Sequence, residues 1–218
     1  NVTYLPRGAG RDGLIAFDTG PANMVLDGIM FRTTNGRFTM DRDGRHAMKG
    51  RVDSRLLAKL LAHPYLSETP PKSTGREMFG EAMQAELLSW PQARKLSVED
   101  LLATCTRWTA EAVGTVRRWV KGGIDDVIVG GGGVKNRAIM EHLKDVFAPA
   151  RVTTFEAHGW DSKALEAVAF AILAYQTVME QCGNVPAVTG ATSPRLLGCI
   201  VPSGPGWYER LHPGRRRK

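Results

Sequence analysis

The sequence of 218 residues is poor in cysteine and has no long apolar run, and both shortages exclude whole classes of protein. Its three cysteines, Cys105, Cys182 and Cys199, form no CxxC pair, which argues against a disulfide framework or a zinc site and indicates reduced, intracellular thiols. No apolar stretch approaches the roughly 20 residues that a membrane-spanning helix needs. We therefore expect a cytoplasmic protein with no membrane partner.

The two ends of the sequence add further expectations. Residues 1–4 carry neither the basic region nor the apolar stretch of a signal peptide, and they open on a β-type segment without an initiator methionine. This start indicates a piece cut from a longer protein. At the other end, residues 215–218 supply four of the positive charges in a formal net charge of +7. Since no aromatic platform accompanies them, we expect a solvated basic tail and no nucleic-acid partner.

Short apolar segments alternate with helical patterns along the chain. The sequence predicts strands at residues 2–5, 14–17, 126–129 and 151–155, and longer helices at residues 81–88, 98–121, 137–147 and 162–181. Asp53 and Ser97 stand before helical patterns as N-cap residues, and Pro21 fits the first turn of another helix. The alternation predicts an α/β fold, and the hairpin at its start makes the sheet mixed. We expect one domain over residues 1–206, followed by the basic tail at residues 207–218.

One glycine pattern resembles a cofactor motif only superficially. Residues 8–13, GAGRDG, match the GxGxxG pattern of dinucleotide-binding loops. Such a loop leads into a helix, whereas this one leads into a predicted strand. The pattern therefore predicts a hairpin turn.

A second glycine run is the strongest candidate for a ligand site. It lies between an apolar strand and a helix and consists of Gly130, Gly131, Gly132 and Gly133. Glycine lets the backbone approach a ligand closely, and the N-terminus of a helix offers free N–H groups to a phosphate. The alternative is a plain strand-to-helix turn, but such a turn needs one glycine rather than four. We therefore predict a nucleotide-binding loop here.

Polar residues elsewhere suggest further parts of a site. Asp18, at a strand end, suits magnesium, directly or through water, or a sugar hydroxyl; alternatively it caps the next helix through an Asx turn. Lys72 and Arg76 stand in one short loop that suits an anion, unless the loop is merely solvated. Glu166 is a lone carboxylate among apolar helical residues, so it either meets a partner in a cleft or faces water.

Six segments taken together resemble the anhydro-N-acetylmuramic acid kinase family. In chain order they are residues 17–21 (FDTGP), 41–44 (DRDG), 71–77 (PKSTGRE), 131–136 (GGGVKN), 166–170 (EAVAF) and 183–191 (GNVPAVTGA). Six ordered motifs are far more specific than any one alone. The segment from Trp207 onward has no recognisable counterpart.

The resemblance implies an actin/hexokinase-type (ribonuclease H-like) fold, with a mixed sheet flanked by helices in this second, C-terminal domain. It implies ATP and Mg²⁺ as cofactors. It also implies hydrolytic opening of 1,6-anhydro-N-acetylmuramic acid coupled to phosphorylation, which gives N-acetylmuramate 6-phosphate in amino-sugar metabolism and peptidoglycan recycling.

The resemblance also assigns residues. Glu166 and Asp18 would act in catalysis and hold the metal. The nucleotide would contact Gly130, Gly131, Gly132, Gly133 and Asn136. The substrate or phosphate cleft would be lined by Thr19, Gly20, Asn23, Lys72, Thr74, Arg76 and Glu77.

Departures from the family pattern define the alternatives. The family's first phosphate loop, of Gly-Thr-Ser-x-Asp-Gly type, and the segment with the aspartate base have no counterpart here, so an N-terminal domain is the implied partner and activity of the chain alone is not expected. Ala22 stands where a glycine is usual.

Residues 74–80, TGREMFG, are similar to levoglucosan kinase, whose substrate is 1,6-anhydroglucose. A non-catalytic remnant that binds nucleotide or a partner is the alternative from another class, and a homodimer remains open.

Overall fold

The centre of the molecule is the long helix α5 (Val98–Gly114). The structure is a computed structural model, and it describes residues 1–201, 204–211 and 214. Most apolar side chains of α5 are buried, with Cys105 and Trp108 fully enclosed. Burial raises the pKa of the Cys105 thiol to about 12, so this thiol stays protonated and serves as a core residue.

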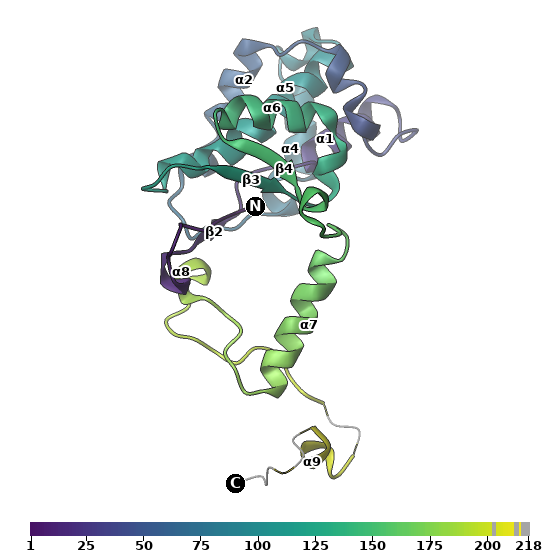
Figure 1. Ribbon diagram of the computed structural model, residues 1–218. Helices are drawn as coiled ribbons and strands as arrows, with labels where there is room; N and C mark the ends of the chain where they lie inside the picture. The colour runs from purple at the N-terminus through teal and green to yellow at the C-terminus, as the bar shows by residue number, and fades with distance from the viewer. Residues whose placement is uncertain (202–203, 212–213, 215–218) are drawn as a thin grey trace.

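Further helices surround α5 (Figure 1). The helices other than α5 are α1 (Met24–Thr33), α2 (Ser54–Leu61), α3 (Arg76–Phe79), α4 (Glu81–Ser89), α6 (Arg137–Phe147), α7 (Leu165–Val178), α8 (Pro186–Thr189) and α9 (Trp207–Leu211). Of these, α1, α2 and α6 pack directly against α5, and α4 packs against α1. None of the helices that the structure describes is long and apolar enough to cross a membrane.

Side-chain caps set the starts of three helices. Asp53 Oδ1 accepts a hydrogen bond of 2.7 Å from the Leu56 N–H at the start of α2. Ser97 Oγ accepts one of 3.0 Å from the Asp100 N–H at the start of α5, so both predicted caps are confirmed. Asn136 caps α6 in the same way. Each such cap stabilises its helix by about 1 kcal/mol.

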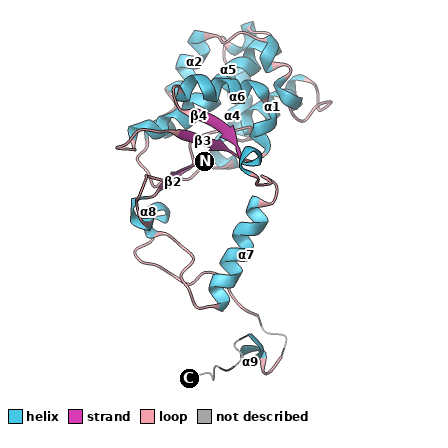
Figure 2. Cartoon of the chain, viewed as in Figure 1, coloured by secondary structure: helices cyan, strands magenta, loops and turns pink. Residues whose placement is uncertain are grey.

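The strands form two small sheets (Figure 2). β1 (Val2–Tyr4) pairs antiparallel with β2 (Ile15–Phe17), which confirms the hairpin. β3 (Asp126–Val129) pairs parallel with β4 (Arg151–Thr154). The α/β class is confirmed, but the single mixed sheet was wrong for the described residues. The hairpin reaches the segment before β3 through the Tyr4 hydroxyl, which donates to the Gly123 carbonyl at 3.3 Å, and not through a ladder of backbone bonds.

Several element boundaries differ from the prediction for local reasons. Pro21 lies ahead of the first turn of α1, because Ala22 adopts a φ of 47° and delays the helix to Met24. Such a φ is natural for glycine and strained for alanine, which fits the glycine expected at this position. α7 stops at Val178 because Glu180 takes a φ of 55°. β3 is only half-buried rather than buried, with Ile128 exposed.

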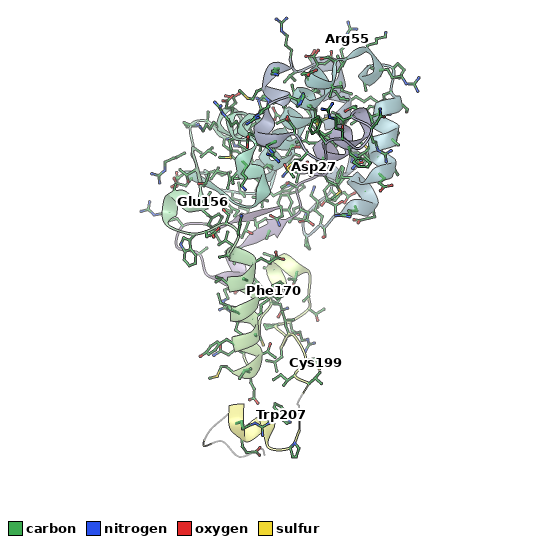
Figure 3. The ribbon with its side chains drawn as sticks, turned by 90° about the vertical axis from the view of Figure 1, so that its right-hand side faces the viewer. Asp27, Arg55, Glu156, Phe170, Cys199 and Trp207 are labelled. Carbon is green, nitrogen blue, oxygen red and sulfur yellow. The ribbon has the colours of Figure 1, made fainter. Side chains whose placement is uncertain are left out.

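The C-terminal part forms an arm that leaves the helical body (Figures 1 and 3). α7 leads outward, and the following segment returns so that α8 packs beside β2. Phe170 and Cys199 lie along the arm, and Trp207 lies at its far end. The predicted basic residues 215–218 lie outside the described residues, and the domain boundary at residue 206 stays a prediction.

Candidate functional site

The second glycine run forms an open loop after β3. Gly131 has φ 79° and ψ −168°, a combination that is essentially restricted to glycine. A Cβ at Gly131 would meet nothing within 4 Å, and one at Gly132 would meet only the Asn23 amide nitrogen, at 3.8 Å. The space before these two residues is therefore free for a ligand. A 3₁₀ turn, Gly132–Lys135, separates the loop from α6, which begins at Arg137 as predicted.

Gly130 and Asn136 serve the packing of this loop. A Cβ at Gly130 would lie 2.8 Å from the Phe155 ring, so only glycine fits there. The Asn136 side chain is buried, and its Oδ1 accepts a hydrogen bond of 3.2 Å from the Ile139 N–H. This oxygen therefore already has a partner as the cap of α6. The nucleotide contact of Asn136 stays a prediction.

The Asp41–Gly44 motif supports the base of the loop. Gly44 has a φ of 71°, and a Cβ there would collide with the Asn136 side chain. The Asp41 carboxylate is buried and accepts hydrogen bonds of 2.9 Å from the N–H groups of His46 and Ala47. Only a glycine lets the chain pass so close to Asn136. This motif therefore acts as a brace for the glycine loop.

The turn between β2 and α1 faces the same loop. Asn23 lies near Gly132 and Gly133, with 3.8 Å from its amide to a Cβ at either position. The Thr109 hydroxyl of α5 donates to the Ala22 carbonyl at 3.1 Å and fixes this turn. The structure therefore brings together two predicted segments that are more than a hundred residues apart, at the carboxyl ends of β2 and β3.

Asp18 joins this turn to the loop that contains Lys72 and Thr74. Its Oδ2 accepts hydrogen bonds from Ser73 Oγ at 2.8 Å and from the Thr74 N–H at 3.0 Å. Thus Asp18 holds a neighbouring loop. The Thr74 hydroxyl is buried and has no hydrogen-bond partner among the described residues. An orphaned hydroxyl beside a carboxylate suits a phosphate oxygen, a water molecule or a hydrated Mg²⁺ ion.

Substitution of Thr74 by valine tests this orphaned hydroxyl. Thr74→Val keeps the shape and removes a buried polar group without a partner, so we expect the free energy of unfolding to stay level or rise by up to about 1 kcal/mol. Urea titration of both proteins measures it. As a control, Thr104→Val removes a hydroxyl that donates to the Asp100 carbonyl at 2.7 Å and should destabilise the protein. Clear destabilisation by Thr74→Val would mean that the hydroxyl already has a partner within the protein.

Lys72 is turned toward the protein body. Its ammonium donates to the Tyr65 carbonyl at 2.7 Å and stands 4.5 Å from the centre of the Tyr65 ring. Burial lowers the pKa of Lys72, and Glu68 opposes that effect. The Tyr65 hydroxyl in turn donates to the Asp18 carbonyl at 2.7 Å. Tyr65 could not be predicted as part of this site, because its contact with Asp18 joins residues that are distant in the chain.

The remaining predicted residues are distributed around this centre. Thr19 is buried, and Gly20 packs against α5, where a Cβ would lie 3.2 Å from Ala112. Arg76 and Glu77 are exposed at the start of α3.

Glu166 lies in the first turn of α7 and is exposed, as the solvent-facing alternative had it. Its neighbour Leu165 packs near the loop, 3.5 Å from a Cβ at Gly130. In the part of the chain that the structure describes, no group of three or more His, Cys, Asp or Glu residues is placed to hold a metal ion. Mg²⁺ takes only one or two carboxylates and keeps several waters, so Asp18 and Glu166 remain its predicted ligands.

A separate groove of about 540 Å³ lies beside the brace. It is lined by Met30, Arg37, Phe38, Thr39, Met40, Asp41, Arg42, Arg45 and His46. No residue of the glycine loop lines it, and most of its side chains are exposed. The converging turns, and not this groove, form the candidate site.

Sequence comparison assigns the chain to a family of sugar kinases. The model of the family "Anhydro-N-acetylmuramic acid kinase" matches residues 1–203, and the chain belongs to this family. A relative of that name from Salinibacter ruber is 43% identical over 208 residues, which cover 94% of this chain and 52% of the relative. One from Caldanaerobacter subterraneus subsp. tengcongensis is 41% identical over 205 residues, which cover 92% and 51%.

The chain spans about half the length of the curated relatives it matches. This ratio also holds for the relative from Gloeobacter violaceus, which is 41% identical over 205 residues, 94% of this chain and 53% of that protein. These relatives are named for the anhydro-muramic acid sugar, and nothing in the comparisons favours the levoglucosan kinase alternative.

Proposed function

We propose that this chain is the nucleotide-binding part of an ATP-dependent kinase for 1,6-anhydro-N-acetylmuramic acid. The reaction opens the anhydro bond with water and transfers the γ-phosphoryl group, which gives N-acetylmuramate 6-phosphate for amino-sugar metabolism and peptidoglycan recycling. The observation that carries the proposal is the approach of Asn23 to the open glycine loop at Gly132 and Gly133, within a member of this kinase family.

Each part of the site has a defined task in this proposal. The open backbone at Gly131 and Gly132 receives the phosphates of ATP. Asp18 orders the loop that carries Thr74, and the Thr74 hydroxyl contacts a phosphate oxygen or a metal-bound water. Mg²⁺ would be held by Asp18 and Glu166 through oxygen atoms, and when bound it neutralises charge on the transferred phosphoryl group. The surrounding fold would be the second domain of an actin/hexokinase-type enzyme.

The half that the chain does not match would supply the rest of the active site. In this proposal it brings the first phosphate loop and the carboxylate base that activates water. We also propose a cytoplasmic location, because Cys182 and Cys199 are exposed free thiols, which suits a reducing compartment.

The proposal is tested by completing the enzyme. The half of the Salinibacter ruber relative that this chain does not match would be fused to the chain, and ADP release would be followed with ATP, Mg²⁺ and each anhydro sugar. We expect turnover of the anhydro-muramic acid sugar by the fusion and no measurable turnover by the chain alone.

Two outcomes would contradict the proposal. A fusion that is folded and binds ATP but turns over only 1,6-anhydroglucose would establish the levoglucosan kinase alternative. A folded fusion that binds nucleotide without turnover of either sugar would leave a non-catalytic nucleotide-binding remnant. The individual halves serve as controls for background ATP hydrolysis.

A further inference from the structure

Helix α7 is apolar on nearly every side and yet carries no buried residue. Its sequence, LEAVAFAILAYQTV, has one charged residue, Glu166. Helices that are apolar all round occur in protein interiors or membranes, and this one is too short to qualify as a membrane span. Exposed fractions of 65% for Phe170 and 60% for Tyr175 show that large apolar side chains reach water on more than one side of this helix.

Five apolar residues of this segment follow a definite pattern. Leu165, Val168, Ile172, Tyr175 and Met179 recur at alternating spacings of three and four, the pattern of a helix-packing seam. At 3.6 residues per turn, these positions fall within about 80° of the helix circumference. The last four are exposed large hydrophobic residues. We call this stripe of five residues the α7 seam, and its periodicity indicates another helix as the covering element.

The chain itself covers a different side of α7. Leu173 packs against the segment that returns from the helix, 3.0 Å from a Cβ at Gly183. On that side the Thr177 hydroxyl donates to the Leu173 and Leu197 carbonyls. This returning segment contacts the C-terminal half of α7 and reaches β2 through α8. The α7 seam points away from these contacts and is left uncovered.

We propose that the α7 seam is the docking surface for a helix of the half that the relatives possess and this chain does not match; this rests on the proposed function. The relatives' unmatched half offers a partner of the right size, since the matched part covers only 51–53% of their length. The seam begins at Leu165, next to Gly130 of the glycine loop. A helix lying along it therefore ends at the nucleotide loop and brings its own residues to the phosphates.

A second copy of the chain is the competing occupant. A pair of α7 helices would cover the same apolar surface but would add nothing to the catalytic centre. The start of the seam at the glycine loop favours the complementary half, because this chain has only two carboxylates predicted to hold the metal and no metal group of three among the described residues.

Cysteine accessibility tests the docking without using activity. Cys182 and Cys199, both exposed, are first changed to serine, while the buried Cys105 stays. Ile172→Cys is then introduced in the chain alone and in its fusion with the unmatched half of the Salinibacter ruber relative. We expect labelling by a maleimide to slow at least tenfold in the fusion, because the thiol becomes buried. The matched control is Phe31→Cys on α1, whose parent residue is 53% exposed, and its labelling rate should not change.

The outcomes separate docking from catalysis. Equal labelling of Ile172→Cys in both proteins overturns the proposal, even if the fusion is active. Slow labelling in an inactive fusion supports the docking and rejects the proposed function. If labelling of the chain alone slows as its concentration rises, and fusion does not change it, the occupant is a second copy and the proposal is wrong. Circular dichroism of every variant checks that the overall helix content is unchanged.

Discussion

Gly132→Val is expected to weaken the binding of a non-hydrolysable ATP analogue by about 100-fold or more, a loss of about 2.7 kcal/mol. A Cβ at this position would meet only the Asn23 amide, at 3.8 Å, so the free protein can accept the side chain. The branched methyl groups would then occupy the space where the ligand phosphates meet the backbone. Isothermal titration calorimetry of the wild-type and variant chains measures the change, and urea titration should give nearly equal unfolding free energies.

Two further glycine substitutions separate occlusion of the ligand from strain in the backbone. Gly123→Val also adds a side chain at a glycine with nothing within 4 Å, but it lies before β3 and should leave binding unchanged. Gly131→Val forces valine to a φ of 79° and should also destabilise the fold by about 1–3 kcal/mol. Equal affinities of the wild type and Gly132→Val would mean that the nucleotide does not approach this loop.

Local chemistry explains which elements the sequence predicted well. The bounds of α6 and β3 match the prediction, because the glycine run and the Asn136 cap mark the junction between them. The Ser97 cap likewise sets the start of α5. Such signals lie within a few residues of the boundary that they determine. They need no knowledge of the rest of the fold.

Pairing between distant strands was predicted less well. Alternating strands and helices correctly indicated an α/β fold, but the order of the strands depends on contacts that periodicity does not encode. The hairpin β1–β2 contacts the segment before β3 through one side-chain hydrogen bond, from the Tyr4 hydroxyl to the Gly123 carbonyl, and not through a ladder of backbone hydrogen bonds. Two small sheets result, each with free edges among the described residues.

In the candidate site, too, local signals were predictable from the sequence and contacts between distant residues were not. Asp18, Asn23 and the glycines were predicted as site residues because acids, amides and glycines at strand ends have recognisable chemistry. The sequence did not predict that the Lys72 ammonium would rest on the Tyr65 carbonyl, since this contact depends on how a separate 3₁₀ turn packs. The orphaned hydroxyl of Thr74 was likewise invisible in the sequence. Burial without a partner is a property of the folded chain alone.

Asp18→Asn in the completed fusion enzyme is expected to lower kcat by about 1,000-fold, which corresponds to about 4 kcal/mol of lost transition-state stabilisation. The amide preserves the size of the side chain, and its oxygen can take the place of Oδ2, which accepts both hydrogen bonds, from Ser73 and from Thr74. It loses the negative charge, which in the proposed site attracts Mg²⁺ beside the phosphates. Coupled assays of ADP release at varied Mg²⁺ measure kcat and the apparent metal affinity.

Ser73→Ala provides the matched control for this substitution. It removes one hydrogen bond to Asp18 Oδ2 but leaves the carboxylate charge and the Thr74 N–H bond in place. A role in ordering the loop would make the two variants similarly impaired, with no change in metal dependence. A role in holding the metal would leave Ser73→Ala within about tenfold of the wild type, since a neutral hydrogen bond is worth about 1 kcal/mol. Only Asp18→Asn would then require more Mg²⁺, and that difference distinguishes a metal ligand from a residue that only orders the loop.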